Sequence, residues 1–140
     1  VIYQKLKLSG GNKMKYPKEL KYVKSHEWVK EEGDVIVVGI SDYAQDALGD
    51  IVFVNLPEEG DDVSIGDAFA DVESVKAVSD IFSPVEGTVK EVNEELVDNP
   101  ALINEAPYDA WLIKVENVSE KEDTMDADAY EKFIAEEAEA

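Results

Sequence analysis

The chain has 140 residues, and 44% of them are hydrophobic, which is enough to bury the core of one domain. It contains 33 acidic residues, 13 lysines and no arginine, so its formal net charge of −20 disfavours binding to nucleic acid or to an anionic membrane. With no cysteine and a single histidine, it has no thiol chemistry of its own and no expected zinc site.

Residues 1–13 are expected to be a lead-in outside the folded domain, although a native lysine-rich tail is the alternative. The stretch "MKYPKELKYVKSHEWVK" begins at Met14 like a fresh start, and we expect the domain to span residues 14–137. No apolar run approaches the ~20 residues that span a bilayer, and no signal peptide is visible. A cytoplasmic location in a prokaryote is therefore expected.

The first predicted elements are a hairpin and a short helix. Residues 22–30 and 35–40 alternate or are β-branched, and the glycine-containing "EEGD" between them indicates a turn. Ser41 can cap a helix over "DYAQDAL", and Gly49 can end it in a left-handed conformation.

The rest of the chain predicts more short strands and a terminal helix. Strands are expected in "IVFVNLP", "VSIGDAFADVESV", "AVSDIFSPV", "EGTVKEVNEEL" and "AWLIKVE", with a helical turn opening at Pro100. Ala127, Tyr130, Phe133 and Ile134 share one face of a helix expected over about 126–137, and 138–140 should fray. The pattern predicts a mainly β sandwich or barrel with a short inserted helix and a C-terminal helix.

Lys76 is one of only three lysines between Glu31 and Val115. Its small apolar neighbours indicate that it crowns a tight hairpin, with acidic residues close by. An activated Schiff-base lysine would need desolvation or a cationic neighbour, and neither is expected here. An exposed lysine that is not itself catalytic suits modification by another enzyme; an ordinary solvent-facing lysine is the alternative.

Five collinear segments carry a resemblance to a known family. They are "KYVKSHEWVK", "VGISDYAQDALGDIVFVNLPEEG", "VESVKAVSDIFSPVEGTVKEVN", "NPALINEAPYDAWLIKV" and "DADAYEKFI". In this order they resemble the glycine cleavage system H proteins over residues 14–137. The resemblance implies a barrel-sandwich hybrid of the lipoyl/biotinyl-carrier type, with lipoate in amide linkage to Lys76. Val75 and Ala77 replace the methionines that flank a typical biotinyl lysine, which favours lipoyl.

The resemblance also assigns site residues. The lipoyl-bearing tip would comprise Glu73, Ser74, Val75, Lys76 and Ala77. Ser25, Glu27 and Asp80 match positions that line a cleft sheltering the aminomethyl-loaded arm, although ordinary surface acids are the alternative for the two carboxylates. We expect Ser25 and Glu27 to share one face of a strand and His26 to face away, so that the three do not form a hydrolase triad. No catalytic residue and no metal ligand is assigned.

The implied function is that of a non-catalytic carrier. An aminomethyl group would pass from glycine decarboxylase (P protein) to a tetrahydrofolate-dependent aminomethyltransferase (T protein), and electrons to dihydrolipoyl dehydrogenase (L protein). A lipoate ligase or octanoyl transferase would supply the lipoyl group; no nucleic acid or membrane partner is implied. The alternatives are an H-like relay that donates lipoyl to other carrier domains, and an unmodified acidic domain that only binds proteins.

Overall fold

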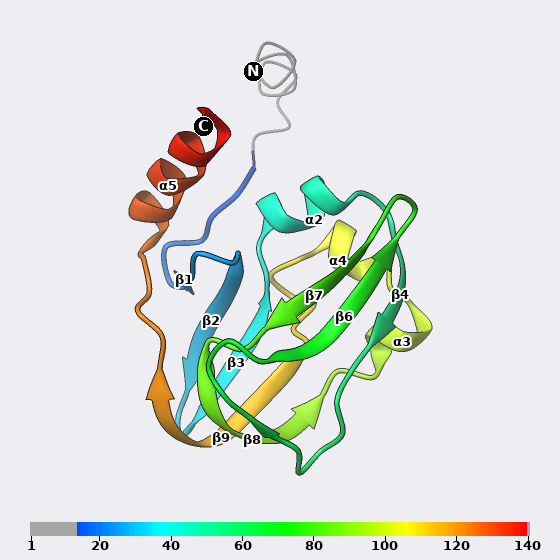
Figure 1. Ribbon diagram of the computed structural model, residues 1–140, viewed down its shortest axis with the longest axis vertical. Helices are drawn as coiled ribbons and strands as arrows, with labels where there is room; N and C mark the ends of the chain where they lie inside the picture. Colours follow the sequence, from blue (N-terminus) through cyan, green and yellow to red (C-terminus); the bar gives the residue numbers. More distant parts are fainter. Residues whose placement is uncertain (1–13, 140) are drawn as a thin grey trace.

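The computed structural model describes residues 14–139 (Figure 1). The expected lead-in over residues 1–13 lies outside the described residues. The elements in chain order are β1 (Lys21–Tyr22), β2 (Glu27–Glu32), β3 (Val35–Ile40), α2 (Asp42–Leu48), β4 (Ile51–Asn55), β5 (Asp62–Val63), β6 (Ala68–Ser74), β7 (Val78–Phe82), β8 (Val85–Val92), α3 (Glu95–Asp98), α4 (Leu102–Glu105), β9 (Ile113–Lys121) and α5 (Ala127–Glu139).

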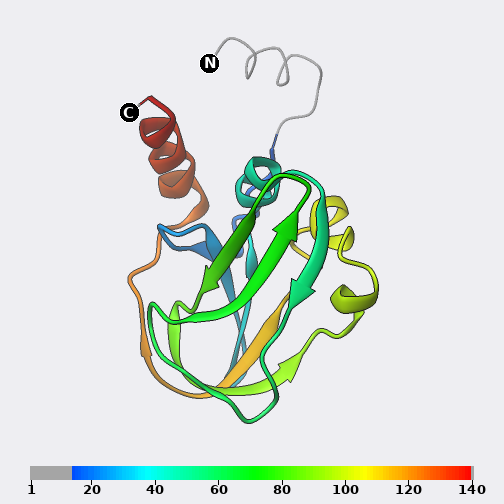
Figure 2. The ribbon, with the colours of Figure 1, turned by 45° about the vertical axis from the view of Figure 1, so that its right-hand side comes forward.

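The strands form two antiparallel sheets. The larger has the order β1-β2-β3-β9-β8-β5, and the smaller has the order β4-β6-β7. Figure 2 shows the smaller sheet lying over the larger one, with the turn between β6 and β7 beside the end of α2. The prediction of a mainly β sandwich with one inserted and one C-terminal helix is confirmed.

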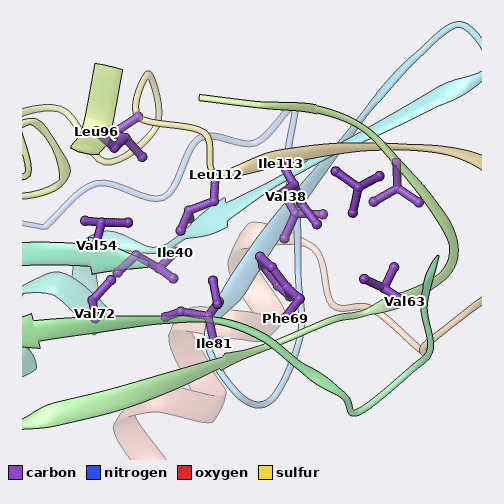
Figure 3. Close-up of a cluster of buried hydrophobic side chains, with 14 of the residues drawn as sticks. Val38, Ile40, Val54, Val63, Phe69, Val72, Ile81, Leu96, Leu112 and Ile113 are labelled. Atoms are coloured by element: carbon purple, nitrogen blue, oxygen red, sulfur yellow. The ribbon is translucent and has the colours of Figure 1, made fainter. Parts of the chain in front are cut away.

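The main core lies between the two sheets. Side chains from both sheets point toward one another in Figure 3, among them Val38 and Ile113 of the larger sheet and Val72 and Ile81 of the smaller. All four are at most 3% exposed. Alternation along each strand explains this, because every second side chain points to the same face.

A second cluster holds α5 against the opposite side of the larger sheet. The rings of Tyr22 and Tyr130 stack with centroids 4.6 Å apart, and Trp28 and Val37 are buried in the same cluster. Phe133 and Ile134 pack onto it from α5. The predicted apolar face of the C-terminal helix is therefore the face that packs.

The inserted helix α2 follows its predicted signals. The Ser41 side chain accepts a hydrogen bond from the backbone N–H of Ala44, and the Gly49 N–H donates to the carbonyl of Gln45. Gly49 has φ +84° and ψ −162°, so its φ is positive as expected, but it lies outside the left-handed helical region. Such a conformation favours glycine, which has no Cβ.

The expected strand over residues 22–30 is wrong as a continuous element. A turn separates β1 from β2, in which the His26 N–H donates to the Val23 carbonyl and His26 has φ +79°. The two strands then pair with each other, with Tyr22 opposite Trp28. The alternating pattern continues through residues 23–26, so it does not indicate the reversal of the chain that the positive φ of His26 creates.

Two smaller departures occur after β8. The short helix α3 was not expected, and α4 begins at Leu102, slightly later than the predicted turn at Pro100. The Ile103 N–H still donates to the Pro100 carbonyl, so the helical turn does open at the proline. Strand β9 begins at Ile113, after the predicted start of the "AWLIKVE" strand.

Candidate functional site

The turn between β6 and β7 presents Lys76. Strand β6 ends at Ser74 and β7 begins at Val78, and the Ser74 N–H donates to the Ala77 carbonyl at 2.8 Å. The Ser74 hydroxyl oxygen also accepts from the N–H groups of Lys76, at 3.2 Å, and Ala77, at 3.1 Å. The Ser74 hydroxyl therefore satisfies two backbone donors of the tip, which fixes a narrow turn at the end of a paired hairpin.

Lys76 is available to another protein. It is exposed, and the side chains of Val75 and Val78 beside it are 69% and 67% exposed. Within residues 14–139, the Lys76 ammonium has no hydrogen-bond or ion-pair partner. An accessible amine on a rigid turn fits the amide attachment of a long acyl group, because neither the core nor an existing ion pair must be disrupted.

Glu27 is the buried carboxyl near this hairpin. It opens β2, is 2% exposed, and accepts a hydrogen bond from the Ser25 hydroxyl. Its other oxygen accepts from the backbone N–H of Phe82 in β7 at 3.3 Å. The carboxyl therefore joins the larger sheet to the strand that leads away from Lys76.

Burial governs the protonation of this carboxyl. Desolvation raises the pKa of Glu27 to about 7, while the hydrogen bonds from Ser25 and Phe82 act in the opposite direction. A carboxyl with such a pKa changes its charge near neutral pH. Without a neighbouring cation, burial favours the protonated form of this carboxyl, and an approaching cation favours its anionic form.

The raised pKa predicts how stability depends on pH. The native state keeps the Glu27 proton between pH 4.5 and about 7, where the unfolded carboxyl has lost it. The free energy of unfolding should therefore fall by about 3 kcal/mol as the pH rises through this window, and level off above it. Glu27→Gln, which mimics the protonated side chain, should remove this part of the slope in urea titrations from pH 4 to 9.

General repulsion among the acidic residues changes stability in the same direction, so the comparison needs a surface control. Glu94→Gln removes one exposed carboxylate and should leave the slope between pH 4.5 and 7 nearly as in the native chain. If Glu27→Gln and Glu94→Gln gave the same pH profile, the buried carboxyl would not be the source of the effect.

Asp80 lies in β7, the strand that Glu27 contacts. It is exposed and stands directly across from Asp71 of β6. Phe82, two residues on, shares its face of the strand and is 37% exposed. The structure thus brings Ser25 and Glu27 into contact and places Asp80 near the same backbone, although within the described part of the chain no hydrogen bond joins Asp80 to either of them.

His26 faces the C-terminal helix instead of its sequence neighbours. Its Nδ1 lies 2.8 Å from the Tyr130 hydroxyl, and its Nε2 lies 3.1 Å from a Glu137 oxygen. The expected separation of His26 from Ser25 and Glu27 is therefore correct. The expectation that Ser25 and Glu27 share one face of a strand is wrong, because Ser25 lies in the turn before β2 and His26 between them has a positive φ. The link to Tyr130 was missed because it joins residues 104 positions apart.

Two facing antiparallel sheets, with an exposed lysine on a hairpin tip of the smaller one, define a carrier domain of the barrel-sandwich type. A family model described as "Glycine cleavage H-protein" matches residues 20–137. The chain belongs to the glycine cleavage H-protein family, whose members carry lipoate on a lysine.

Individual relatives agree with this placement. The glycine cleavage system H protein of Halalkalibacterium halodurans is 56% identical over 124 residues, which cover 86% of this chain and 97% of the relative. That of Lachnoclostridium phytofermentans is 52% identical over 127 residues, which cover 90% of this chain and all of the relative. A crystal structure of a glycine cleavage system H protein from Mycobacterium marinum matches with a TM-score of 0.80 and 40% identity, over 85% of this chain and 98% of that one.

None of the helices between residues 14 and 139 is both long and apolar enough to cross a membrane.

Proposed function

We propose that this chain is a non-catalytic carrier of glycine cleavage and that Lys76 is its lipoyl attachment site. The observation that carries the proposal is the position of Lys76, exposed at the tip of the β6–β7 hairpin in a chain of this family. When attached, lipoate supplies the dithiolane for thiol–disulfide and one-carbon transfer chemistry, which a chain without cysteine cannot provide.

Four neighbours of Lys76 complete the proposed attachment tip. Ser74 holds the backbone of the turn through its hydroxyl. Val75 and Ala77 are exposed and carry no charge, so a modifying enzyme meets little desolvation cost on either side of the lysine. Glu73 stands across from Val78 and adds a negative charge that a basic partner surface would recognise.

Ser25, Glu27 and Asp80 are proposed to hold the ammonium of the carried one-carbon unit. The Glu27 carboxyl is buried and already positioned by the Ser25 hydroxyl and the Phe82 N–H. A charge-assisted hydrogen bond to such a group is stronger than one at the surface, and the enclosed position limits access of water. Asp80 adds negative charge on the adjacent strand.

The proposed partners are glycine decarboxylase, the tetrahydrofolate-dependent aminomethyltransferase and dihydrolipoyl dehydrogenase, together with a lipoate ligase or octanoyl transferase. The outer face of the smaller sheet suits basic partners, since Asp71, Glu73 and Asp80 lie there beside Phe53, which is 44% exposed. We further propose that residues 14–137, including the C-terminal helix, form the functional unit and that it works in the cytoplasm.

The attachment site is tested by incubating the native chain with lipoate ligase, lipoate and ATP, followed by intact mass and peptide mapping. A lipoyl-sized addition on the peptide that contains Lys76 is the expected result. No addition, or an addition of the size of biotin, would contradict the proposal.

Glu27→Ala combined with Asp80→Ala should still accept lipoate but retain its one-carbon cargo for a shorter time. Each lost charged hydrogen bond is worth about 1.5–3 kcal/mol, so the rate of cargo loss should rise at least about tenfold. The measurement is formaldehyde release from the charged carrier after its removal from glycine decarboxylase. Glu94→Ala with Asp109→Ala removes two carboxyl groups at exposed positions and should release formaldehyde at the native rate.

A further inference from the structure

The connection between α2 and β4 lies directly against the Lys76 tip. The Val75 N–H donates to the Asp50 carbonyl at 3.0 Å. The Lys76 Cε would lie 3.4 Å from a Cβ atom built at Gly49, so the lysine stem runs over the place where Gly49 has no side chain. We call residues 49–51 the seat of the lysine, because they hold its backbone neighbour and support its aliphatic stem.

A single side chain holds the seat from the other side. The Asn104 amide nitrogen, on α4, donates to the Gly49 carbonyl and to Gln45 Oε1, each at 2.9 Å. Its Oδ1 accepts from the Ile51 N–H at 2.8 Å. Asn104 therefore binds the seat on both sides of Asp50, and only a side chain with a donor and an acceptor at this spacing can make both bonds.

We propose that Asn104 is a positioning residue for Lys76, which sets the direction in which the lysine leaves the hairpin by fixing the seat. The chain of contacts runs from Asn104 to Gly49 and Ile51, then from Asp50 to Val75. This inference rests on the proposed function, in that Lys76 is taken as the attachment site. In this role Asn104 contacts neither the attached lipoyl group nor a partner protein.

The positive φ of Gly49 makes this support necessary. Glycine has more conformational freedom than any other residue type, and at φ +84° the chain turns here from α2 into β4. The Gly49 carbonyl belongs to the Gly49–Asp50 peptide, and the Ile51 N–H belongs to the Asp50–Ile51 peptide, which also carries the Asp50 carbonyl. Without the Asn104 bonds, both peptides can rotate and draw the Asp50 carbonyl away from the Val75 N–H. The hairpin itself stays paired, because β6 and β7 hold each other independently.

The first test uses the unmodified chain and amide hydrogen exchange. Asn104→Ala removes the bonds to the Gly49 carbonyl and to the Ile51 N–H together, so that neither peptide beside Asp50 is held. Exchange of the Val75 amide should become about tenfold faster, as expected for one hydrogen bond, while the amide of Val72 in the core keeps its native rate. Asn104→Ser, whose short hydroxyl cannot reach both the Gly49 carbonyl and the Ile51 N–H, is measured alongside, so that a folding defect peculiar to one variant does not decide the result.

Gln45→Ala is the matched control. It removes one partner of the same amide but leaves the bonds from Asn104 to Gly49 and Ile51 in place. Val75 should then exchange within about twofold of the native rate. Native exchange of Val75 in both Asn104 variants, or equal acceleration in Gln45→Ala, would overturn the role of Asn104.

The second test is the kinetics of lipoate attachment. The Asn104 variants should show a lower kcat/KM as lipoyl acceptors, by about tenfold, and Ile103→Val, which perturbs the same helix from its buried side, should not. Equal kcat/KM for native chain and variants would overturn the inference. If the native chain itself took up no lipoate, the proposed function would fail. The amide hydrogen exchange of Val75 would still show whether Asn104 fixes residues 49–51.

Discussion

Lys76→Arg is expected to fold like the native chain and to lose lipoate attachment and glycine cleavage together. Arginine keeps the positive charge and much of the length of the side chain, but its guanidinium stays protonated and cannot form the lipoyl amide. Without lipoate the chain has no sulfur that can accept the one-carbon unit. The rate of glycine–bicarbonate exchange should therefore fall by about 1000-fold or more, within the roughly 10²–10⁴-fold range of the advantage that tethering gives. The measurement is exchange in the system reconstituted with its partner enzymes.

The control for this variant is Lys90→Arg, which changes an exposed lysine of β8 in the same way. It should accept lipoate and support exchange as the native chain does. Lipoyl attachment at a different lysine in the Lys76→Arg variant, with native exchange activity, would show that the site has been assigned to the wrong residue.

Gly39→Ala is expected to destabilise the fold strongly, although it adds only one methyl group. Gly39 of β3 stands opposite Trp28 of β2, and a Cβ atom at Gly39 would lie 2.5 Å from two carbons of the indole ring. The ring cannot easily move, because it is 2% exposed and its Nε1–H donates to the Pro107 carbonyl. We expect a loss of about 3 kcal/mol in urea unfolding, at the upper end for overpacking.

A double-mutant cycle identifies the clash as the cause. In a Trp28→Phe background the smaller ring leaves room, so Gly39→Ala should cost at least about 1 kcal/mol less than in the native chain. Gly33→Asn serves as the control for replacing a glycine. Gly33 has φ +62° with no atom within 4 Å of a built Cβ, and asparagine tolerates that conformation. Equal costs of Gly39→Ala in both backgrounds would exclude the ring as the obstacle.

The sequence predicted well those features that depend on single positions or on short runs of residues. Ser41 and Gly49 delimit α2 because a cap and a positive φ are properties of single positions with known preferences. Strand β3 follows its β-branched run from Val35 to Ile40. The exposed position of Lys76 at a hairpin tip was likewise predicted, because a tight turn between two apolar runs directs its middle residue outward.

The features that could not be predicted from the sequence depend on contacts between residues far apart in the chain. The reversal at His26 is held by Tyr130 and Glu137 of α5, which no local pattern connects to it. The burial of Glu27 follows from the position of β7, since a glutamate beside a tryptophan reads equally well as a surface residue. Asn104 appears in the sequence as one polar residue of a short helix, and only the packing of α4 against α2 reveals its three hydrogen bonds.

The position of β7 has a consequence for self-association. Among the described residues, β7 forms one border of the smaller sheet, and a bordering strand can add strands from other molecules. Here Asp80 places a charge in the middle of that border, and Glu27 already occupies the Phe82 N–H. A hairpin that must remain exposed to be modified is thereby protected from intermolecular β-sheet growth.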